Sequence, residues 1–566
     1  MNPSEARSYI RDTIISQVYI QSHKEYFSNG AGEKQTTGWL FDFRRVIMQG
    51  AMIDAIGTVF TETFKQIPKY QVCGLEVAAI PLVTGITQFR YNHGETSANG
   101  FFIRKSRKKE GLLRMIEGTI YKDTPIILVD DIMNQGKTFM RQIQVLETLG
   151  YKIHAVWTIL RYRDESFYTF LHERGIEIHS VITLDELAKD IQVKNLVALP
   201  QVPPMQQQYT PTWKFTSDDP NYFWVVPKSA PVLDAERVFF GADNGNFWAI
   251  RQSDGSIAWS YKVGLGAKGK RIFSTAAVYD GTVFFGAYDG NVYALDADTG
   301  KRKWVFFDAD WVGSSPVVAP KLGLVFIGLE FGLWKKRGGI AAISIETGKK
   351  VWWDNSMRNY THATPLYVEQ KDEVVIGSND GILRLYDART GVIKWSSKTG
   401  DPSPKELQSG FSEYDIKSSP AYDPKLDIVI AANMHGTLCA LARDSGKQQW
   451  STQAEFGFFG SPIIHHDTVL AASLDKHLYC VSLKDGTIHW KCELGARLFS
   501  TPLIVNGQVV VGSNDGRVYS VNPVTGTVIG HTTLTERITN AVAYRKETDT
   551  LFVTTYANEL YSLKRQ

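Results

Sequence analysis

The chain has 566 residues, of which 43% are hydrophobic and 21% charged, an ordinary composition for a folded globular protein. This composition excludes a largely disordered chain, a collagen and a small disulfide scaffold. Lysine and arginine number 62 against 59 aspartates and glutamates, so the charge balance indicates no nucleic-acid partner. No apolar run approaches the ~20 residues of a membrane span, and we expect no membrane partner.

The N-terminus and the cysteines indicate the compartment. Residues 1–12 include Glu5, Arg7 and Arg11, where a signal peptide would have an apolar core. The four cysteines form no CxxC pair, which favours reduced thiols. We therefore expect a cytoplasmic protein.

Residues 1–198 mix strand and helix patterns. Residues 125–129 and 153–160 are apolar runs typical of strands. Between them, residues 138–150 place three apolar side chains on one helical face and end in Gly150, which can close the helix in a left-handed cap. Strand, helix and strand in this order predict a parallel βαβ unit and an α/β domain.

A repeated unit begins after residues 199–210, a segment rich in proline and glutamine that we interpret as an interdomain linker. The clearest units have an Asn-Gly or Asp-Gly turn, an apolar strand, a Thr-Gly turn and, in most, a tryptophan, and weaker copies keep part of this plan. A period of about 40–50 residues with four short strands is typical of a β-propeller blade. The marker tryptophans are Trp259, Trp304, Trp352, Trp395, Trp450 and Trp490.

The number of units predicts the number of blades. Seven units carry the plan, but the seventh has Gly530 near the position of its tryptophan. An eighth unit, residues 540–563, stops before its last strand, and residues 211–215, with Trp213, supply a matching strand. We therefore predict an eight-bladed propeller over residues 211–566, closed by strands from both ends of that segment; seven blades is the alternative.

These units resemble the tryptophan-docked repeats of pyrroloquinoline-quinone enzymes and of related quinone-free scaffold propellers. The resemblance implies a fold and says little about function. Quinoprotein dehydrogenases of this type carry an adjacent cysteine pair, which this sequence lacks. We therefore expect no pyrroloquinoline quinone, and we interpret most aromatic residues here as blade packing.

The clearest chemical motif is PIILVDDIMNQGKTFM, residues 125–140. An apolar strand ends in Asp130 and Asp131, and residues 134–138 form a short loop that opens a helix. The free N–H groups and the positive end of that helix favour a phosphate, and the carboxylates suit ribose hydroxyls. Taken alone, the pattern also fits a Mg²⁺ site or a solvated loop.

At these residues the sequence resembles the type I phosphoribosyltransferases, and the orotate phosphoribosyltransferase branch in particular. Four further segments match in the family's order, namely residues 27–45 around the base, 73–83 as pyrophosphate loop, 101–118 as strand and mobile catalytic loop, and 172–187 at the end of the domain. The resemblance implies a type I phosphoribosyltransferase fold and a homodimer in which the mobile loop reaches the neighbouring active site.

The resemblance also implies phosphoribosyl transfer from phosphoribosyl pyrophosphate (PRPP) to a base nitrogen, with Mg²⁺ bound through the substrate and no dedicated protein ligands. It implies catalytic roles for Lys108, Asp130 and Asp131. A basic run such as residues 104–109 alone would fit a solvated loop or a nuclear-import signal, and the flanking match favours the site. The residues expected to bind PRPP are Arg104, Lys105, Lys109, Asp130, Asp131, Asn134, Gln135, Gly136, Lys137 and Thr138.

Four positions depart from the family. Lys137 is larger than the family's small residue there, and it could either contact the 5′-phosphate or crowd the site. Glu110 stands where the loop usually has histidine, Ser28 where the N-terminal segment has lysine, and Asn134 where the phosphate loop begins with threonine. A carboxylate cannot donate a hydrogen bond to pyrophosphate. Without the lysine, an anionic orotate lacks a cationic partner, unless Arg161 or Arg163 compensates, so the departures argue against orotate as acceptor.

Three functions remain open on the sequence. The first is an active phosphoribosyltransferase that uses a base other than orotate, with a propeller that binds a protein partner. The second is a PRPP-binding sensor without transfer activity, and the third is an interaction scaffold.

Overall fold

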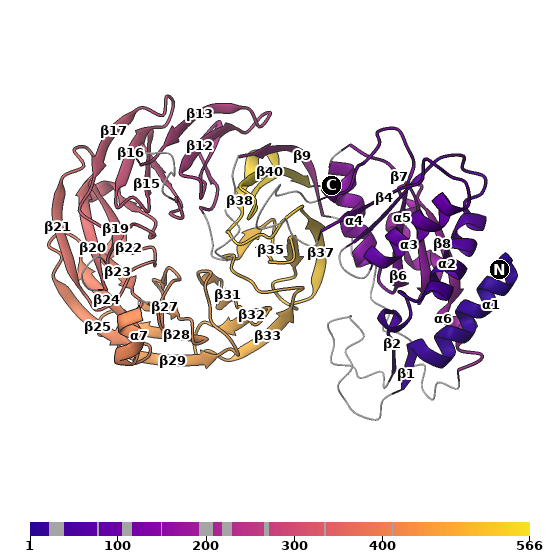
Figure 1. Ribbon diagram of the computed structural model, residues 1–566. Helices are drawn as coiled ribbons and strands as arrows, with labels where there is room; N and C mark the ends of the chain where they lie inside the picture. Colours follow the sequence, from indigo (N-terminus) through magenta and orange to yellow (C-terminus); the bar gives the residue numbers. More distant parts are fainter. Residues whose placement is uncertain are drawn as a thin grey trace. The chain divides into compact units, whose positions relative to one another are not determined.

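The computed structural model describes residues 1–21, 39–75, 79–104, 116–148, 150–191, 208–217, 229–264, 271–332, 336–409 and 411–565. The chain divides into two compact units, one of residues 1–206 with 533–535 and one of residues 207–532 with 536–566 (Figure 1). Strand β9 begins at Tyr209, so ordered propeller structure starts two residues before the boundary expected from the sequence.

The first unit is built on a six-stranded sheet in the order β5-β4-β3-β6-β7-β8. Only the β4–β5 pairing is antiparallel; the other four are parallel. The chain places β4 on one side of β3 and β6 on the other, so the strand order reverses between β3 and β6. The strands are β3 (Gln71–Leu75), β4 (Asn99–Ile103), β5 (Ile116–Glu117), β6 (Ile126–Met133), β7 (Ile153–Arg161) and β8 (Glu177–Thr183), and β1 (Tyr19–Gln21) pairs separately with β2 (Trp39–Phe41).

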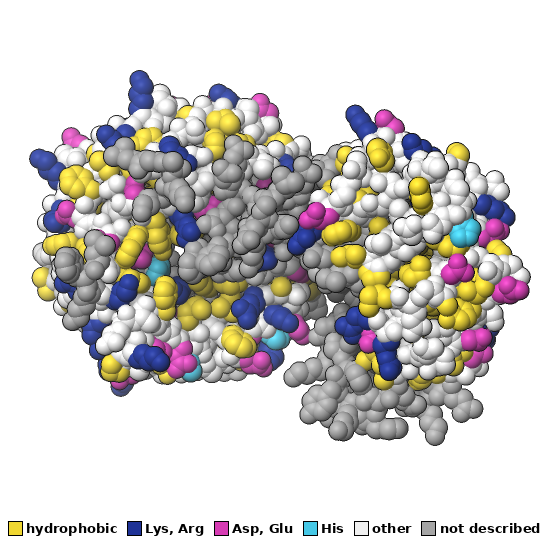
Figure 2. Space-filling model, viewed as in Figure 1, with side chains coloured by type: hydrophobic (Ala, Val, Ile, Leu, Met, Phe, Trp, Pro, Cys, Tyr) yellow, Lys and Arg dark blue, Asp and Glu magenta, His cyan; other side chains and the backbone are white. Residues whose placement is uncertain are grey.

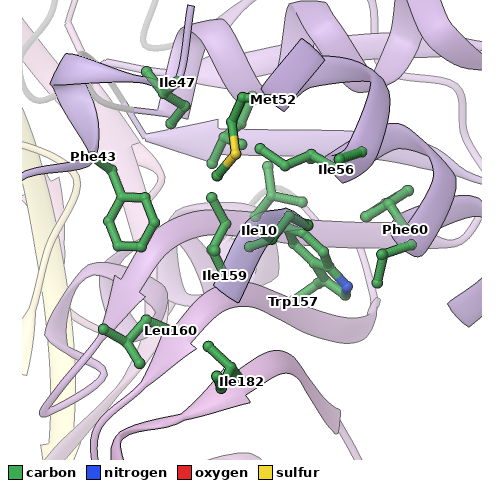
Figure 3. Packing of buried hydrophobic residues seen from close by; sticks show 14 of the residues in the cluster. Ile10, Phe43, Ile47, Met52, Ile56, Phe60, Trp157, Ile159, Leu160 and Ile182 are labelled. Carbon is green, nitrogen blue, oxygen red and sulfur yellow. The ribbon is translucent and has the colours of Figure 1, made fainter. Parts of the chain in front are cut away.

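Helices cover both faces of this sheet. On one face, Ile10, Met52 and Phe60 pack around Trp157 of β7 (Figure 3). On the other face, helix α4 packs its apolar side against β6 and β7. The helices are α1 (Pro3–Thr13), α2 (Gly50–Thr63) and α3 (Ala79–Asn92) on the first face, α4 (Lys137–Thr148) and α5 (Thr169–His172) on the second, and the short α6 (Leu184–Leu187).

Helix α4 matches the helix expected from the sequence. Phe139, Ile143 and Leu146 are buried on one face. Gly150 has a φ of +80°, and the Tyr151 N–H donates to the Leu146 carbonyl over 2.9 Å. The predicted left-handed cap is therefore confirmed, and the parallel strands on either side complete the predicted βαβ unit.

The second unit is a β-propeller of eight four-stranded antiparallel sheets within the described residues, arranged around a common axis (Figure 1). The last sheet has the order β38-β39-β40-β9, in which Trp213 of β9 lies opposite Ser562 of β40. The eight-blade prediction and the closing role of residues 211–215 are both confirmed.

The blades follow one another in chain order. The first four contain β10 (Val232–Leu233), β11 (Arg237–Gly241), β12 (Asn246–Arg251) and β13 (Ile257–Lys262); β14 (Ala277–Tyr279), β15 (Thr282–Gly286), β16 (Val292–Asp296) and β17 (Arg302–Phe306); β18 (Val317–Ala319), β19 (Leu324–Phe331), β20 (Arg337–Ser344) and β21 (Lys350–Met357); β22 (Leu366–Val368), β23 (Glu373–Gly377), β24 (Ile382–Asp387) and β25 (Ile393–Lys398).

Helix α7 (Pro404–Ser409) follows the fourth blade. The last four blades contain β26 (Ala421–Asp423), β27 (Ile428–Ala432), β28 (Thr437–Ala442) and β29 (Gln448–Gln453); β30 (Ile463–His465), β31 (Thr468–Ala472), β32 (His477–Ser482) and β33 (Ile488–Glu493); β34 (Leu503–Val505), β35 (Gln508–Gly512), β36 (Arg517–Val521) and β37 (Val528–Thr533); β38 (Ala543–Arg545), β39 (Thr550–Thr554), β40 (Glu559–Arg565) and β9 (Tyr209–Thr216).

Tryptophans join neighbouring blades, as the repeats predict. The Trp352 Nε1–H donates to the Ala388 carbonyl of the next blade over 2.9 Å. A Cβ atom on Gly391 would lie 2.6 Å from the Trp352 ring, so only glycine fits beneath it, and its φ of +74° also favours glycine. The same docking joins Trp213 to Gly255, Trp259 to Gly300, Trp304 to Gly348, Trp395 to Gly446, Trp450 to Gly486 and Trp490 to Gly526.

The junction between the seventh and eighth blades is built differently. Gly530 of β37 stands where the other blades have tryptophan. Here the Thr532 hydroxyl accepts from the Tyr209 N–H over 2.9 Å and donates to the Tyr209 carbonyl over 3.0 Å. Both Tyr209 and Thr532 are buried, and this pair ties the incoming strand β9 to the seventh blade.

On the face shown in Figure 2, basic and acidic side chains are interspersed on each unit. Among the helices that the structure describes, none is both long enough and apolar enough to cross a membrane. The four cysteines are unpaired and buried.

Candidate functional site

The acidic pair lies where the strand order of the sheet reverses. In open α/β sheets, ligands bind outside the carboxyl ends of the strands at such a switch point. Asp130 and Asp131 are near the carboxyl end of β6, beside β3. Since successive side chains of a strand alternate, Asp131 lies on the face of Ile127 and Val129, and Asp130 on the opposite face, with α4.

Asp131 is held in a partly apolar surrounding. Burial raises the pKa of Asp131, against the opposing effect of a hydrogen bond from the Ile132 N–H, which donates to Asp131 Oδ1 over 2.8 Å. Arg44, in the short helical turn Phe43–Arg45, also favours the charged carboxylate. Tyr162 faces the same carboxylate, and burial together with the Asp131 charge raises the pKa of Tyr162. Asp131 is therefore within electrostatic range of a cation and a phenol.

The loop after β6 has a fixed backbone. Gly136 has a φ of +71°, and a Cβ atom there would lie 2.9 Å from the Phe170 ring. The Tyr168 hydroxyl donates to the Asn134 carbonyl over 2.8 Å and to the Met133 carbonyl over 3.1 Å. This loop leads directly into α4, whose first N–H groups have no carbonyl partners within the helix, so its geometry suits an anion.

The other predicted residues of the loop are near this turn. Gln135 and Thr138 are half-buried on either side of Gly136. Lys137 is the first residue of α4, but its side chain lies outside the described residues. The Arg163 Nε–H donates to Asn134 Oδ1 over 3.1 Å, and the guanidinium lies 4.5 Å from the Phe167 ring centre. Arg163 is thus hydrogen-bonded to Asn134, the residue that stands where the family has threonine.

Arg161 ends β7, opposite Met133 of β6. Its Nε and Nη1 atoms are buried and have no hydrogen-bond partner among the described residues. Arg161 forms an ion pair with Glu165, whose Oε2 is 3.8 Å from Arg161 Nη1. A buried guanidinium with unsatisfied donors is costly unless a ligand or water completes its hydrogen bonds.

The basic residues expected to bind pyrophosphate follow β4. Arg104 Nη1 lies 3.4 Å from Glu117 Oε1 across the β4–β5 pairing. Lys105, Lys108, Lys109 and Glu110 fall within residues 105–115, outside the described residues, and Ser28 falls within residues 22–38, also outside. Their predicted roles stay predictions.

The carboxylates fit a magnesium ion that is held mainly by a substrate. Within the described ranges, no group of three or more His, Cys, Asp or Glu side chains is arranged to hold a metal. Mg²⁺ is commonly bound through one or two carboxylates together with substrate phosphates. The pair Asp130 and Asp131 matches that requirement.

Sequence reasoning missed three neighbours of the site. Tyr168 donates to the loop carbonyls, and Arg44 and Tyr162 interact electrostatically with Asp131, but none of the three belongs to the strand-loop-helix motif. Arg44 was within a segment matched to the family, and its charge was the available signal. The two tyrosines follow β7 and carried no signal separable from core packing.

The second unit identifies the family of the chain. A sequence model described as outer membrane protein assembly factor BamB matches residues 210–361, 309–415 and 379–563. These matches together cover more than half of the chain, and the chain belongs to this family. The same region has the fold of BamB from Moraxella catarrhalis, at a TM-score of 0.51 and 19% identity, over 63% of this chain and 99% of that one.

The propeller fold is also similar to that of a quinohemoprotein alcohol dehydrogenase from Comamonas testosteroni. The TM-score is 0.52 at 14% identity, over 63% of this chain and 76% of that chain. At this identity the likeness establishes the propeller fold alone.

The first unit has orotate phosphoribosyltransferases among its relatives. The enzyme from Pyrococcus furiosus is 22% identical over 153 residues, which are 27% of this chain and 80% of that protein. The enzyme from Methanothermobacter thermautotrophicus is 18% identical over 185 residues, 33% of this chain and 96% of that protein. Uridine 5'-monophosphate synthase from Bos taurus is 27% identical over 146 residues, but the match spans only 29% of that longer protein. The resemblance noted from the sequence is therefore confirmed.

Proposed function

We propose that the first unit is a Mg²⁺-dependent phosphoribosyltransferase that uses PRPP and a nucleobase-like acceptor other than orotate. The observation that carries the proposal is the position of Asp130 and Asp131 at the switch point, next to the Gly136 loop that opens α4. The orotate phosphoribosyltransferase relatives support the class of reaction.

Each part of PRPP has a chemically suited partner. The N–H groups at the start of α4 would hold the 5′-phosphate, and the two carboxylates would accept hydrogen bonds from the ribose hydroxyls. Bound Mg²⁺ would offset charge on the pyrophosphate. Arg104, with the basic residues that follow it, would stabilise the negative charge that develops on the leaving pyrophosphate.

The acceptor base would lie on the Asp131 face of the sheet edge. Arg44, which pairs with Asp42 over 2.7 Å, and Tyr162 interact electrostatically with Asp131 there. Arg161, in register with Met133, ends the adjacent strand. The buried, unsatisfied donors of Arg161 suit a base that presents a carbonyl oxygen. Arg163 is engaged by Asn134, so we assign the base to Arg161.

The test is pyrophosphate release from Mg–PRPP across a broad panel of nucleobases, orotate included. We expect release with at least one base other than orotate and little or none with orotate. Binding of Mg–PRPP without release for any base would favour the sensor function, which the departures at Glu110, Ser28 and Asn134 motivate. Absence of PRPP binding would leave the scaffold function.

Lys108→Ala should reduce turnover much more than PRPP binding. The resemblance assigns Lys108 to the mobile catalytic loop, where its charge would act on the transition state. We expect kcat to fall by about 100-fold with a change of less than about threefold in the Kd for PRPP. Steady-state kinetics and calorimetric titration measure the two effects, and equal losses in both would contradict the assigned role.

Arg161→Gln should raise KM for the base by about tenfold or more, since hydrogen bonds to a charged group contribute roughly 1.5–3 kcal/mol. The Kd for PRPP should stay unchanged. Arg174→Gln is the matched control, because Arg174 pairs with Glu147 on the surface, away from the sheet edge. An unchanged KM for the base in Arg161→Gln would remove Arg161 from the proposed base site.

A homodimer, a protein partner on the propeller and a cytoplasmic location complete the proposal. The dimer is expected because the mobile loop of related enzymes serves the neighbouring active site. Light scattering of the purified chain measures the oligomeric state, and a monomer that retains full activity would contradict the shared-site arrangement.

A further inference from the structure

The propeller has an axial cavity of about 590 Å³ to which all eight blades contribute. The segment before the innermost strand of each blade reaches the cavity. Seven of these segments present a hydroxyl, from Thr275, Ser315, Thr364, Ser419, Ser461, Thr501 and Thr539.

The wall of the cavity is fixed by hydrogen bonds between blades. The Ala230 N–H donates to Thr275 Oγ1 over 3.0 Å, and the Thr275 N–H donates to Ser315 Oγ over 2.9 Å. The Ser461 N–H donates in the same way to Thr501 Oγ1, over 2.9 Å. A cavity whose wall is held in this way is preformed, which lowers the cost of ordering it around a ligand.

One side of the cavity carries buried ionisable groups. Glu330, which is 2% exposed, accepts a hydrogen bond at Oε1 from the Gly313 N–H over 2.8 Å. Its Oε2 is 3.5 Å from Nε2 of His362, which lines the cavity. His362 Nδ1 is 3.3 Å from Asn379 Oδ1, so the tautomer with hydrogen on Nδ1 leaves Nε2 as an acceptor facing Glu330.

The charges of this group favour an anionic ligand. Burial lowers the pKa of His362 to about 3 and raises that of Glu330 to about 7, so the two do not form an ion pair at neutral pH. Lys417 lines the same side, 3.1 Å from Asp415 Oδ2, and Arg271 also lines the cavity. Two cations, Lys417 and Arg271, thus belong to the lining of the cavity, whereas Asp415 and Glu330 lie behind it.

Aromatic rings give the cavity a flat apolar surface as well. Phe273, Phe411, Phe459 and Phe499 line the cavity. The Phe459 and Phe499 ring centres are 5.6 Å apart, and Lys417 Nζ lies 4.8 Å from the centre of the Phe411 ring. Aromatic faces of this kind pack well against a planar ring, and the lysine lies beside them.

We propose that the axial cavity binds a small planar aromatic or heteroaromatic carboxylate. The ring would pack against the phenylalanines, and the carboxylate would accept hydrogen bonds from Lys417 and from the hydroxyls that line the cavity. This site lies wholly within the propeller and does not depend on the phosphoribosyltransferase proposal.

Calorimetric titration of the full-length protein with benzoate tests the proposal. Benzoate has no ring nitrogen that could accept a phosphoribosyl group, so the first unit has no reason to bind it. We expect saturable binding of benzoate and of nicotinate, at least tenfold weaker binding of the uncharged nicotinamide, and at least tenfold weaker binding of the non-planar cyclohexanecarboxylate. Equal binding of all four, or no binding of benzoate and nicotinate, would overturn the proposal.

Two alanine-to-phenylalanine variants test whether benzoate binds in the axial cavity. Ala541→Phe fills the cavity that Ala541 lines and should weaken benzoate binding at least tenfold. Ala235→Phe, in an exposed turn before β11, should leave binding unchanged, as should Asp131→Asn in the other unit. Benzoate binding that survives Ala541→Phe or is lost in Asp131→Asn would overturn the assignment.

The pH dependence of benzoate affinity is an independent measurement, and it uses Glu330→Gln, a variant that keeps the fold. The groups facing Glu330 are Tyr288, His362 and Lys417, with Arg271 beyond Tyr288. Glu330 lies directly behind Gly313 and His362 of the cavity wall. Because a charged Glu330 would repel the carboxylate of the ligand and a protonated one would not, affinity should fall as the pH rises through about 7. Glu330→Gln should remove most of this dependence, and an equal dependence in the variant would contradict the role of Glu330.

Discussion

Asp131→Asn is expected to weaken binding of Mg–PRPP by about 10- to 100-fold, the loss of a charged acceptor worth roughly 1.5–3 kcal/mol. The substitution keeps the shape of the side chain. Its Oδ1 atom can still accept the 2.8 Å hydrogen bond from the Ile132 N–H. The amide lacks the charge that two ribose hydroxyls would need, so the loss falls on the ligand and not on the fold.

Titration calorimetry with Mg–PRPP measures this loss, with Asp12→Asn as the control. Asp12 is exposed in α1 and its backbone carbonyl, not its side chain, accepts from Ser16. Since burial raises the pKa of Asp131, the wild-type affinity should decline as the pH falls through that raised value, because the protonated form is a poorer acceptor. Equal affinities in Asp131→Asn and Asp12→Asn would remove Asp131 from the site.

Trp352→Ala is expected to lower the free energy of unfolding of the propeller by about 3 kcal/mol, the range for removing a large packed aromatic side chain. Trp352 covers Gly391 and donates to the Ala388 carbonyl, so its loss leaves both a void and an unpaired carbonyl between two blades. The neighbouring Trp353 is 38% exposed and contacts Phe331 and Lys350 at the surface.

The two adjacent tryptophans therefore form a matched pair. Trp353→Ala should cost about 1 kcal/mol or less, as is usual for exposed positions. Differential scanning calorimetry of the full chain, followed through the propeller transition, compares the two variants with wild type. Similar losses for both would show that docking over Gly391 is not what stabilises this junction.

The propeller was predictable because its information is local and repeated. Each unit carries its own turn glycines and its own tryptophan, and Trp213 was recognisable as the missing member of the last blade. The seventh junction was not predictable, because it depends on Tyr209 and Thr532, which are 323 positions apart. No repeat pattern marks a contact that occurs once.

The candidate site was predictable only in part. Asp130, Asp131 and the Gly136 loop are contiguous, so strand and helix signals were enough to place them together. Arg44 and Arg161 reach the same edge from separate segments, and only the folded sheet brings them there. The axial cavity had a visible but unused signal, since Ser315, Ser419 and Thr501 each precede a proline at the same point of their blades. Its buried carboxyl Glu330 lies in a strand of otherwise apolar residues and carried no motif.

Titration of the wild-type chain with PRPP in the presence of Mg²⁺ tests the central claim most directly. We expect saturable binding of one PRPP per chain, because the acidic pair and the α4 loop form one binding site. This binding should be abolished by removing Mg²⁺ and unaffected by Ala541→Phe. A wild-type chain that binds no PRPP under conditions in which both units remain folded would contradict it.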